Sequence, residues 1–299
     1  MKHHLALSAL LLAGTTLLYA QEPSPAPPAK PQLLLSGYAQ TGYTYNSADE
    51  SNTFDIKRII FMADVRFTER LLTYFMYDFA GGGNLLEIYA EYRVRPELNI
   101  RAGQFKTMYS FENPLSPCYT ELINCYSQAV SYLAGVNGSD PLYGASSGRD
   151  FGLLVYGDLL DKRLSYNLAL MNGQGINHKD RNRSKDLVGS LLVNPLPWLS
   201  VGGTFQQGTG HAAAVSPFNP GVAAGENYRR NRVSVGALVK TTPVEVRTEY
   251  LSGRDADVSS RGYYLSTTVH ILPKLDAVAS YDFLDKNTDR AFAAPTRQT

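Results

Sequence analysis

Charged side chains alternate with mainly apolar ones from Val244 to Tyr250, and this spacing is the clearest chemical pattern in the sequence. Glu245, Arg247 and Glu249 occupy every second position. Because successive side chains of a strand point to opposite faces, these three charges share one face of a predicted strand. Charges in such a row can line an aqueous passage and set its ion selectivity, or they can pair with charges on neighbouring strands and stiffen a wall.

The same alternation extends to other segments. In each segment, the face that carries the polar side chains gives candidate pore-lining residues. These residues are Arg58, Asp64, Arg66, Tyr74, Asp78, Glu87, Glu91, Arg93, Arg101, Glu245, Arg247 and Glu249. Acidic and basic side chains are nearly balanced in this set, whereas an excess of bases would favour anions. We therefore expect a weakly selective passage. Pairing of facing bases and acids is an equally good interpretation for any single residue.

Thirteen segments have a period of two and are predicted to be strands. They are residues 33–45, 54–67, 71–79, 85–93, 99–105, 149–157, 164–171, 186–193, 200–207, 230–240, 244–250, 262–271 and 275–283. Their lengths cluster near the roughly 9 to 11 residues that a tilted strand needs to cross a membrane. Strands of soluble sheets are shorter, with a mode of about 5 to 6 residues. The lengths therefore favour strands that cross a membrane.

The connections between these segments alternate in length. Short ones cover residues 68–70, 94–98, 158–163, 194–199, 241–243 and 272–274, and mostly long ones, rich in Gly, Asn, Asp and Ser, cover 46–53, 80–84, 106–148, 172–185, 208–229 and 251–261. Outer-membrane barrels have tight turns at one end and long loops at the other. The sequence therefore predicts an all-β fold, a transmembrane antiparallel β-barrel, with residues 33–283 as its wall.

Thirteen strands cannot complete such a barrel. Bacterial single-chain barrels have even strand numbers, and lipid cannot satisfy an open sheet edge. We expect about thirteen of sixteen strands to be visible and the C-terminal strands to be missing, with residues 284–299 as an atypical tail that holds no further strand. An overcount by one strand is the alternative interpretation.

The first 32 residues are predicted to be a targeting segment and a leader. Lys2 precedes an apolar run at residues 5–18 and the small residue Ala20, so residues 1–20 are expected to be a secretory signal peptide. Residues 21–32 are rich in proline and are expected to be an extended periplasmic leader. A periplasmic N-terminus would place the short turns in the periplasm and the long loops outside the cell.

The longest connection, residues 106–148, is the best candidate for a constriction. Its candidate side chains are Lys106, Tyr109, Glu112 and Asp140. Folded inward, it would narrow the passage; lying over the mouth or packing on a neighbouring subunit is nearly as well supported. Residues 119–133 of this connection are predicted to be helical.

Cys118 and Cys125 lie in the same connection, and oxidising surroundings would permit a disulfide between them. On a continuous helix they would be about 10 Å apart at 1.5 Å rise per residue, which is too far for a disulfide. A disulfide would therefore require a break in the predicted helix.

Arg229, Arg230 and Arg232 form the one dense basic cluster, at a predicted loop-to-strand junction on the outer side. An exposed cluster could attract anions, bind lipopolysaccharide phosphates or simply be solvated. The whole chain has 28 Lys and Arg against 27 Asp and Glu, and removal of Lys2 with the signal peptide leaves 27 of each. This balance argues against nucleic acid as a partner.

Signals for catalysis or metal binding are thin. Beyond residue 20 the histidines are His178, His211 and His270, none with a second His or Cys at metal-ligand spacing. Residues 180–186 resemble a calcium loop, but Lys185 stands where Gly is needed. The sequence has no nucleophile elbow and no P-loop. We therefore predict neither enzymatic activity nor a metal site nor a cofactor.

Four motifs follow one another along the chain. They are Phe54-Asp55-Ile56-Lys57-Arg58; Gly103-Gln104-Phe105-Lys106 with Phe111-Glu112; Gly148-Arg149-Asp150-Phe151-Gly152-Leu153; and Asn172-Gly173-Gln174-Gly175 with Asn177, Asp180, Asn182, Lys185 and Asp186 downstream. In this order they resemble the phosphate-selective porin O and P family of outer-membrane channels, over about residues 36–282. The resemblance implies a trimeric sixteen-strand barrel that passes small anions or general solutes. The chain departs from the family in its missing C-terminal strands and in its lack of a basic excess.

Taken together, these features predict an outer-membrane porin, a water-filled channel for passive diffusion of small hydrophilic solutes and ions, with phosphate or other inorganic anions implied by the resemblance. Its expected partners are outer-membrane lipid and two further copies in a homotrimer. A non-transporting barrel that serves as an adhesion or assembly scaffold is the first alternative. A barrel hydrolase is the second, and it would need a Ser or Asp beside a histidine at the outer rim.

Overall fold

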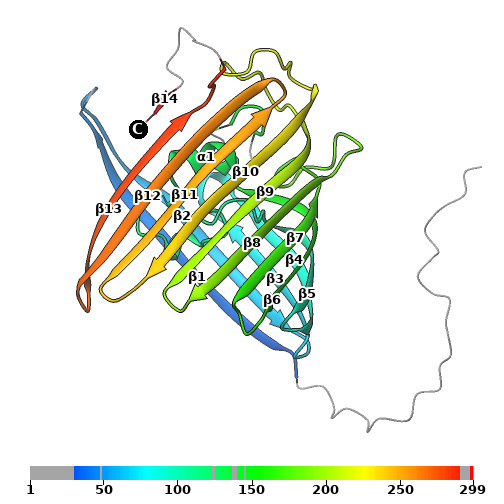
Figure 1. The fold of residues 1–299 in the computed structure, drawn as a ribbon, viewed down its shortest axis with the longest axis vertical. Helices are drawn as coiled ribbons and strands as arrows, with labels where there is room; N and C mark the ends of the chain where they lie inside the picture. Colours follow the sequence, from blue (N-terminus) through cyan, green and yellow to red (C-terminus); the bar gives the residue numbers. More distant parts are fainter. Residues whose placement is uncertain are drawn as a thin grey trace, which may run out of the picture.

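The strands of the protein form a single antiparallel sheet, in which they lie side by side in sequence order. The computed structural model describes residues 30–47, 49–122, 125–136, 140–144, 146–289 and 297–298; the predicted signal peptide and most of the predicted leader lie outside these residues. The strands are β1 (Gln32–Asn46), β2 (Ser51–Arg66), β3 (Leu71–Asp78), β4 (Asn84–Arg95), β5 (Leu98–Lys106), β6 (Arg149–Leu159), β7 (Leu164–Met171), β8 (Asp186–Leu196), β9 (Leu199–His211), β10 (Asn227–Lys240), β11 (Val244–Asp255), β12 (Val258–Leu272), β13 (Leu275–Asp285) and β14 (Arg297–Gln298). Figure 1 shows them as a tilted, strongly curved wall.

The predicted fold class is confirmed, because each of the thirteen predicted strands is present and pairs antiparallel with its neighbours in the sequence. Helical structure in the described residues is limited to η1 (Ala80–Gly82), η2 (Pro117–Tyr119) and α1 (Gln128–Leu133). The predicted helix at residues 119–133 is therefore much shorter than expected. The prediction of no strand in the tail was also wrong, since the two-residue β14 pairs with Leu284 and Asp285 of β13.

Two of the predicted long connections are instead tight turns. β1 and β2 are joined by residues 47–50, and β11 continues to Asp255 before β12 begins at Val258. The period of two continues through β11, where Leu251, Gly253 and Asp255 are buried between more exposed neighbours. The strict alternation of short and long connections was therefore wrong at these two places. Residues 107–148, 172–185 and 212–226 do form long connections, all at the same end of the sheet.

The sheet is not closed within the described residues. β1 pairs with β2 along one edge, and β13 pairs with β12 and, over two residues, with β14. No pairing joins β1 to β13 or β14 in the part of the chain that the structure describes. This arrangement is consistent with the expectation of thirteen visible strands in a sixteen-strand barrel.

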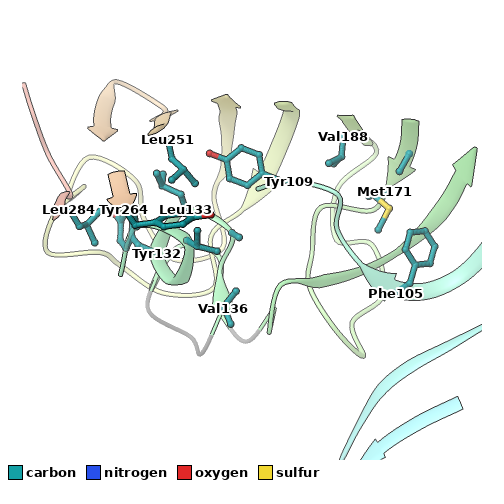
Figure 2. Close-up of a cluster of buried hydrophobic side chains, with 14 of the residues drawn as sticks. Phe105, Tyr109, Tyr132, Leu133, Val136, Met171, Val188, Leu251, Tyr264 and Leu284 are labelled. Atoms are coloured by element: carbon teal, nitrogen blue, oxygen red, sulfur yellow. The ribbon is translucent and has the colours of Figure 1, made fainter. Parts of the chain in front are cut away.

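The larger cluster of buried apolar side chains lies on the concave side of the sheet, around the connection between β5 and β6. Figure 2 shows Phe105, Met171 and Val188 at one side of this cluster, Tyr132, Leu133, Leu251, Tyr264 and Leu284 at the other, and Tyr109 between them. The cluster therefore joins two parts of the wall through a segment that lies between them.

Candidate functional site

The two faces of the wall have opposite chemistry. Side chains of the outward parity are large, apolar and exposed, and Val235 in the middle of β10 is 60% exposed. The inward parity carries buried acids and bases, among them Glu91, Asp186, Arg230 and Glu249. Soluble proteins almost never bury charged side chains completely, and they place most large apolar side chains inside. An apolar outer face around a polar interior is instead the arrangement of a membrane barrel.

The described residues of the range 107–148, here named the inner segment, turn into the concave side of the wall. The Tyr109 hydroxyl donates to the backbone oxygen of Val233 on β10 at 3.4 Å. The backbone N–H of Ser110 donates to Thr204 Oγ1 on β9 at 2.9 Å, and its hydroxyl donates to Glu249 Oε2 on β11 at 2.8 Å. Three neighbouring strands therefore hold the beginning of the inner segment.

Helix α1 lies in the same segment and packs against β11, β12 and β13. The Ser127 side chain caps it by accepting the N–H of Val130 at 3.2 Å. The backbone N–H and side-chain amide of Gln128 donate to the Asp282 carboxylate at 2.8 and 2.9 Å. A Cβ at Gly253 would lie 2.7 Å from Leu133 Cδ2, so this glycine leaves the room into which α1 docks.

The four predicted constriction side chains are buried where they anchor the inner segment. Lys106 Nζ donates to the carbonyl oxygen of Asn113 at 2.9 Å, and the Glu112 carboxylate accepts the N–H of Ser127 at 2.8 Å. Lys106, Tyr109, Glu112 and Asp140 are each less than a tenth exposed. They therefore hold the segment in place and do not present their charges to an open passage.

Arg232 of β10 joins the inner segment to the wall. Its Nη2 lies 2.9 Å from Asp140 Oδ2 and 2.6 Å from Asp255 Oδ2, and its Nη1 donates to the carbonyl oxygen of Leu133. The guanidinium group and the Asp140 carboxylate are fully buried. One guanidinium group therefore bridges a carboxylate of the inner segment and one of β11.

Arg230, two residues earlier, forms a second buried network on the same face. Its Nη1 lies 3.2 Å from Asp186 Oδ2 on β8, and its Nη2 donates to the Tyr228 hydroxyl at 2.7 Å. The guanidinium carbon lies 3.9 Å from the centre of the Tyr143 ring, within the range of a cation–π interaction. Gln206 also donates to Asp186, at 2.7 Å. The network ties β8, β9 and β10 to the inner segment.

The prediction that Arg229, Arg230 and Arg232 form an exposed basic cluster is therefore wrong. Only Arg229 is exposed, whereas Arg230 and Arg232 are 1% exposed and paired with acids. Residues two apart on a strand share a face, and here that face is the inner one. Arg229 and Arg230 are adjacent in the sequence, but their side chains point to opposite faces of β10 and therefore do not form a cluster.

The wall formed by β2 to β5 carries most of the predicted lining residues in pairs. The inner face holds Asp64, Arg66, Tyr74, Asp78, Glu87, Glu91, Arg93 and Arg101, by burial and register. Arg101 lies 2.6 Å from Glu91, and Arg66 lies 3.3 Å from Asp64. Glu87 pairs at 2.9 Å with Arg149, which belongs to one of the four motifs but not to the predicted lining residues.

Arg58 differs from these paired charges. The register shifts between Gln40 and Thr41 of β1, which leaves Lys57 as an extra residue and turns both Lys57 and Arg58 to the inner face. Lys57 pairs with Asp55 at 3.3 Å, whereas Arg58 donates to the side-chain oxygen of Gln40. Among the ion pairs of the described residues, none includes Arg58.

Glu245, Arg247 and Glu249 do share the inner face of β11, with Tyr250 exposed on the other. Glu249 is covered by the inner segment, and Arg247 donates to Glu121 of that segment. Pairing of charges therefore describes most of the predicted set, and the lining of an aqueous passage stays a prediction.

The structure does not join the two cysteines for which the sequence would permit a disulfide. Cys118 is exposed and Cys125 is buried. The helix between them is broken as a disulfide would require, because η2 ends at Tyr119 and α1 begins at Gln128.

The buried position of Glu112 predicts a pH effect on the docking of the inner segment. Burial raises the pKa of its carboxyl from 4.5 to about 7, against the opposing effect of the Ser127 N–H. The docked state of the inner segment favours the protonated form of Glu112. The contribution of this group to the stability of the docked state is therefore fully present below about pH 4.5 and is lost as the pH rises through about 7. Proteolysis of the inner segment should be slower at about pH 5.5 than at about pH 8. Glu112→Gln should reduce that difference, and an unchanged pH dependence in this variant would contradict the assignment.

Several residues that organise this site were missed in the sequence analysis. Asp255 and Gly253 lie in a stretch assigned to a loop, although the alternation of β11 runs through both. Asp186 was placed at the start of the predicted strand 186–193 but not among the lining residues, and it is the fully buried partner of Arg230. Continuing the period of two beyond residue 250 would have found the first two.

Neither a metal site nor a membrane-crossing helix is found in the described ranges. No group of three or more His, Cys, Asp or Glu in these ranges is placed to hold a metal ion. No helix of the described residues is long and apolar enough to cross a membrane.

The wall is similar in fold to solved bacterial outer-membrane proteins. One is a loop L8 deletion mutant of OmpT, an outer membrane protein of Vibrio cholerae, at a TM-score of 0.58 and 11% identity over 86% of this chain and 82% of that chain. Another is the anion-selective porin from Comamonas acidovorans, at a TM-score of 0.60 and 14% identity over 86% of this chain and 79% of that chain. A third is the outer membrane channel DcaP of Acinetobacter baumannii, at a TM-score of 0.56 and 12% identity over 85% of this chain and 79% of that chain.

Sequence comparisons add nothing to this likeness, since no protein-family model and no curated protein sequence matches the chain. The resemblance to the phosphate-selective porin O and P family therefore has no independent support from sequence. Identities of this size establish the fold alone: the chain has the antiparallel strand arrangement of outer-membrane β-barrels, in a sheet that is open within the described residues.

Proposed function

We propose that the protein is an outer-membrane porin, a water-filled channel through which small hydrophilic solutes and ions diffuse passively. The observation that carries this proposal is the inverted wall, with exposed apolar side chains outside and charged side chains inside. In water, so much exposed apolar surface would promote association. Lipid covers such a face, and a charged interior suits water and ions. The proposal is of a passive channel and not of an enzyme.

Exposed aromatic side chains near both ends of the strands support the membrane setting. Phe67, Tyr92 and Trp198 lie near the short-turn end, and Phe54 and Phe79 lie near the long-loop end. Aromatic girdles of this kind flank the apolar band of membrane barrels, where their rings lie at the level of the lipid headgroups.

The same proposal includes a periplasmic N-terminus and a homotrimer. The grouping of the three long connections at one end supports the orientation, because outer-membrane barrels carry long loops outside and short turns in the periplasm. The trimer comes from the family resemblance and would be tested by the mass of the complex in mild detergent.

Passage of phosphate or other inorganic anions is a finer part of the proposal, and Arg58 supports it. Most inner charges form compensated pairs, which favours weak selectivity, whereas the Arg58 guanidinium has no acidic partner among the described residues. An unpaired base on a channel wall attracts anions.

Arg58→Glu is expected to shift the reversal potential in a salt gradient toward cation preference, because it replaces an uncompensated base with an acid at one point of the wall. A shift of several millivolts or more, well beyond the scatter between channels, would be measured on single channels in planar bilayers. Arg70→Glu, in the exposed turn between β2 and β3, is the control and should change the potential less. Equal effects of both variants would show that Arg58 does not face the ion path.

Swelling of liposomes that contain the purified protein tests the proposed channel. Solutes of increasing size should enter at decreasing rates, as in diffusion through a water-filled opening. A scaffold without transport is the second candidate, because the inner segment and its buried cluster occupy part of the concave side. Inserted protein that admits no solute of any size would favour the scaffold and overturn the channel.

A further inference from the structure

A small pocket lies between the inner segment and the inner face of β10, β11 and β12, adjacent strands in Figure 1. Its floor is formed by two rows of side chains across the three strands. One row is Leu238, Arg247 and Ser266, and the other is Lys240, Glu245 and Thr268. The register of the sheet therefore fixes the positions of six lining residues.

Leu115 and Glu121 of the inner segment form the roof of this pocket. Arg247 Nη2 donates to the Glu121 carboxylate, so the floor holds the roof directly. The carbonyl oxygen of Leu115 accepts hydrogen bonds from Lys106 Nζ and, at 3.2 Å, from the Tyr126 hydroxyl. The pocket therefore exists when the inner segment is docked on the wall.

Two polar atoms of the floor are buried without a hydrogen-bond partner. They are Arg247 Nε and Ser266 Oγ, whose residues are directly opposite each other on β11 and β12. Buried polar groups normally have partners, and a missing partner is costly. Nε–H can only donate, whereas a hydroxyl can donate and accept. Both atoms have almost no accessible surface, so a ligand hydroxyl group reaches them only after a small shift of the Arg247 or Ser266 side chain; it can then accept from Nε–H and exchange a hydrogen bond with Ser266.

Part of the charge around the pocket is compensated, because Arg247 is paired with Glu121. Lys240 lies directly opposite Glu245 in the register, without an ion pair between them in the described residues. His270 lies 3.7 Å from Glu245, at the edge of the same region. A free anion or cation would have to compete with these contacts, whereas an uncharged ligand would leave them intact.

We propose that this pocket binds a small, uncharged, polyhydroxylated solute of about the size of one sugar ring. Hydroxyl groups match the two unpartnered atoms and the carboxylates, and the Leu115 and Leu238 side chains offer apolar surface to the ring. The volume of about 250 Å³ lies just below the roughly 300 to 1,000 Å³ of sites for drug-sized ligands, which suits a smaller molecule. The inference rests on the proposed function, since it names a solute class for that channel.

Binding of glucose to the full chain in detergent micelles, measured by ligand-observed NMR, tests this site without requiring conduction. Ser266→Ala should weaken glucose binding on the order of tenfold, since one hydrogen bond to the ligand is lost at a buried position. Ser260→Ala is the matched control on the same strand and face, outside the pocket, and should bind as the original protein does. Intact circular dichroism of both variants would show that each has folded.

The outcomes separate the site from the channel. Glucose binding that Ser266→Ala weakens and Ser260→Ala leaves unchanged supports the site. Absent or variant-independent binding overturns it, even where liposome swelling shows a working channel. Inorganic phosphate or the zwitterion glycine binding more tightly than glucose, with the same dependence on Ser266, also overturns it, because the pocket would then select charge.

Discussion

Arg232→Met should release the inner segment from the wall and destabilise the protein by about 3 to 5 kcal/mol. The substitution leaves the Asp140 and Asp255 carboxylates buried without their shared cation, and breaking a buried ion pair on one side has this order of effect. It also removes the donor to the Leu133 carbonyl at the end of α1. Urea unfolding in lipid vesicles measures the loss, and limited proteolysis reports the exposure of residues 107–148.

Two further variants make this result interpretable. Arg229→Met changes the exposed neighbour on the other face and should shift stability by no more than about 0.5 kcal/mol. Replacing Arg232, Asp140 and Asp255 together by apolar residues should recover most of the loss, since no charge is then left buried and unpaired. An Arg232→Met protein as stable and as protease-resistant as the original would contradict the role of this triad.

Val235→Lys should impair folding into a bilayer by about 2 to 4 kcal/mol, because a lipid-facing base near mid-depth carries this penalty. Val235 lies in the middle of β10 on the outward parity and is 60% exposed. The equilibrium between folded and unfolded protein in vesicles, followed by heat-modifiable gel mobility, gives the free energy. Val235→Leu is the control and should fold as the original does. An unimpaired Val235→Lys protein would mean that this face does not contact lipid.

The strands and the parity of their faces could be predicted from the sequence, because a period of two is a local property. Glu245, Arg247 and Glu249 share one face as expected, with Tyr250 on the other. Errors arose where the alternating pattern was stopped too early, as at Asp255 in β11. They also arose where neighbours in the sequence were treated as neighbours in space, as with Arg229 and Arg230.

The docking of the inner segment could be predicted only as one of several outcomes. Its anchors are far apart in the sequence, as in the bonds from Ser110 to Glu249 and from Gln128 to Asp282. The space for α1 depends on the missing side chain of Gly253 on another strand. No local pattern links these residues, so the contacts that hold the segment are visible only in the folded wall.

Single-channel recording of the purified full chain in a planar bilayer tests the central claim most directly. The inverted wall predicts discrete steps of current that scale linearly with voltage, and the sign of the reversal potential in a salt gradient then separates an anion preference from weak selectivity. Protease protection would show whether the protein is folded and inserted. If folded and inserted protein carried no current, this result would contradict the account of the wall as a channel.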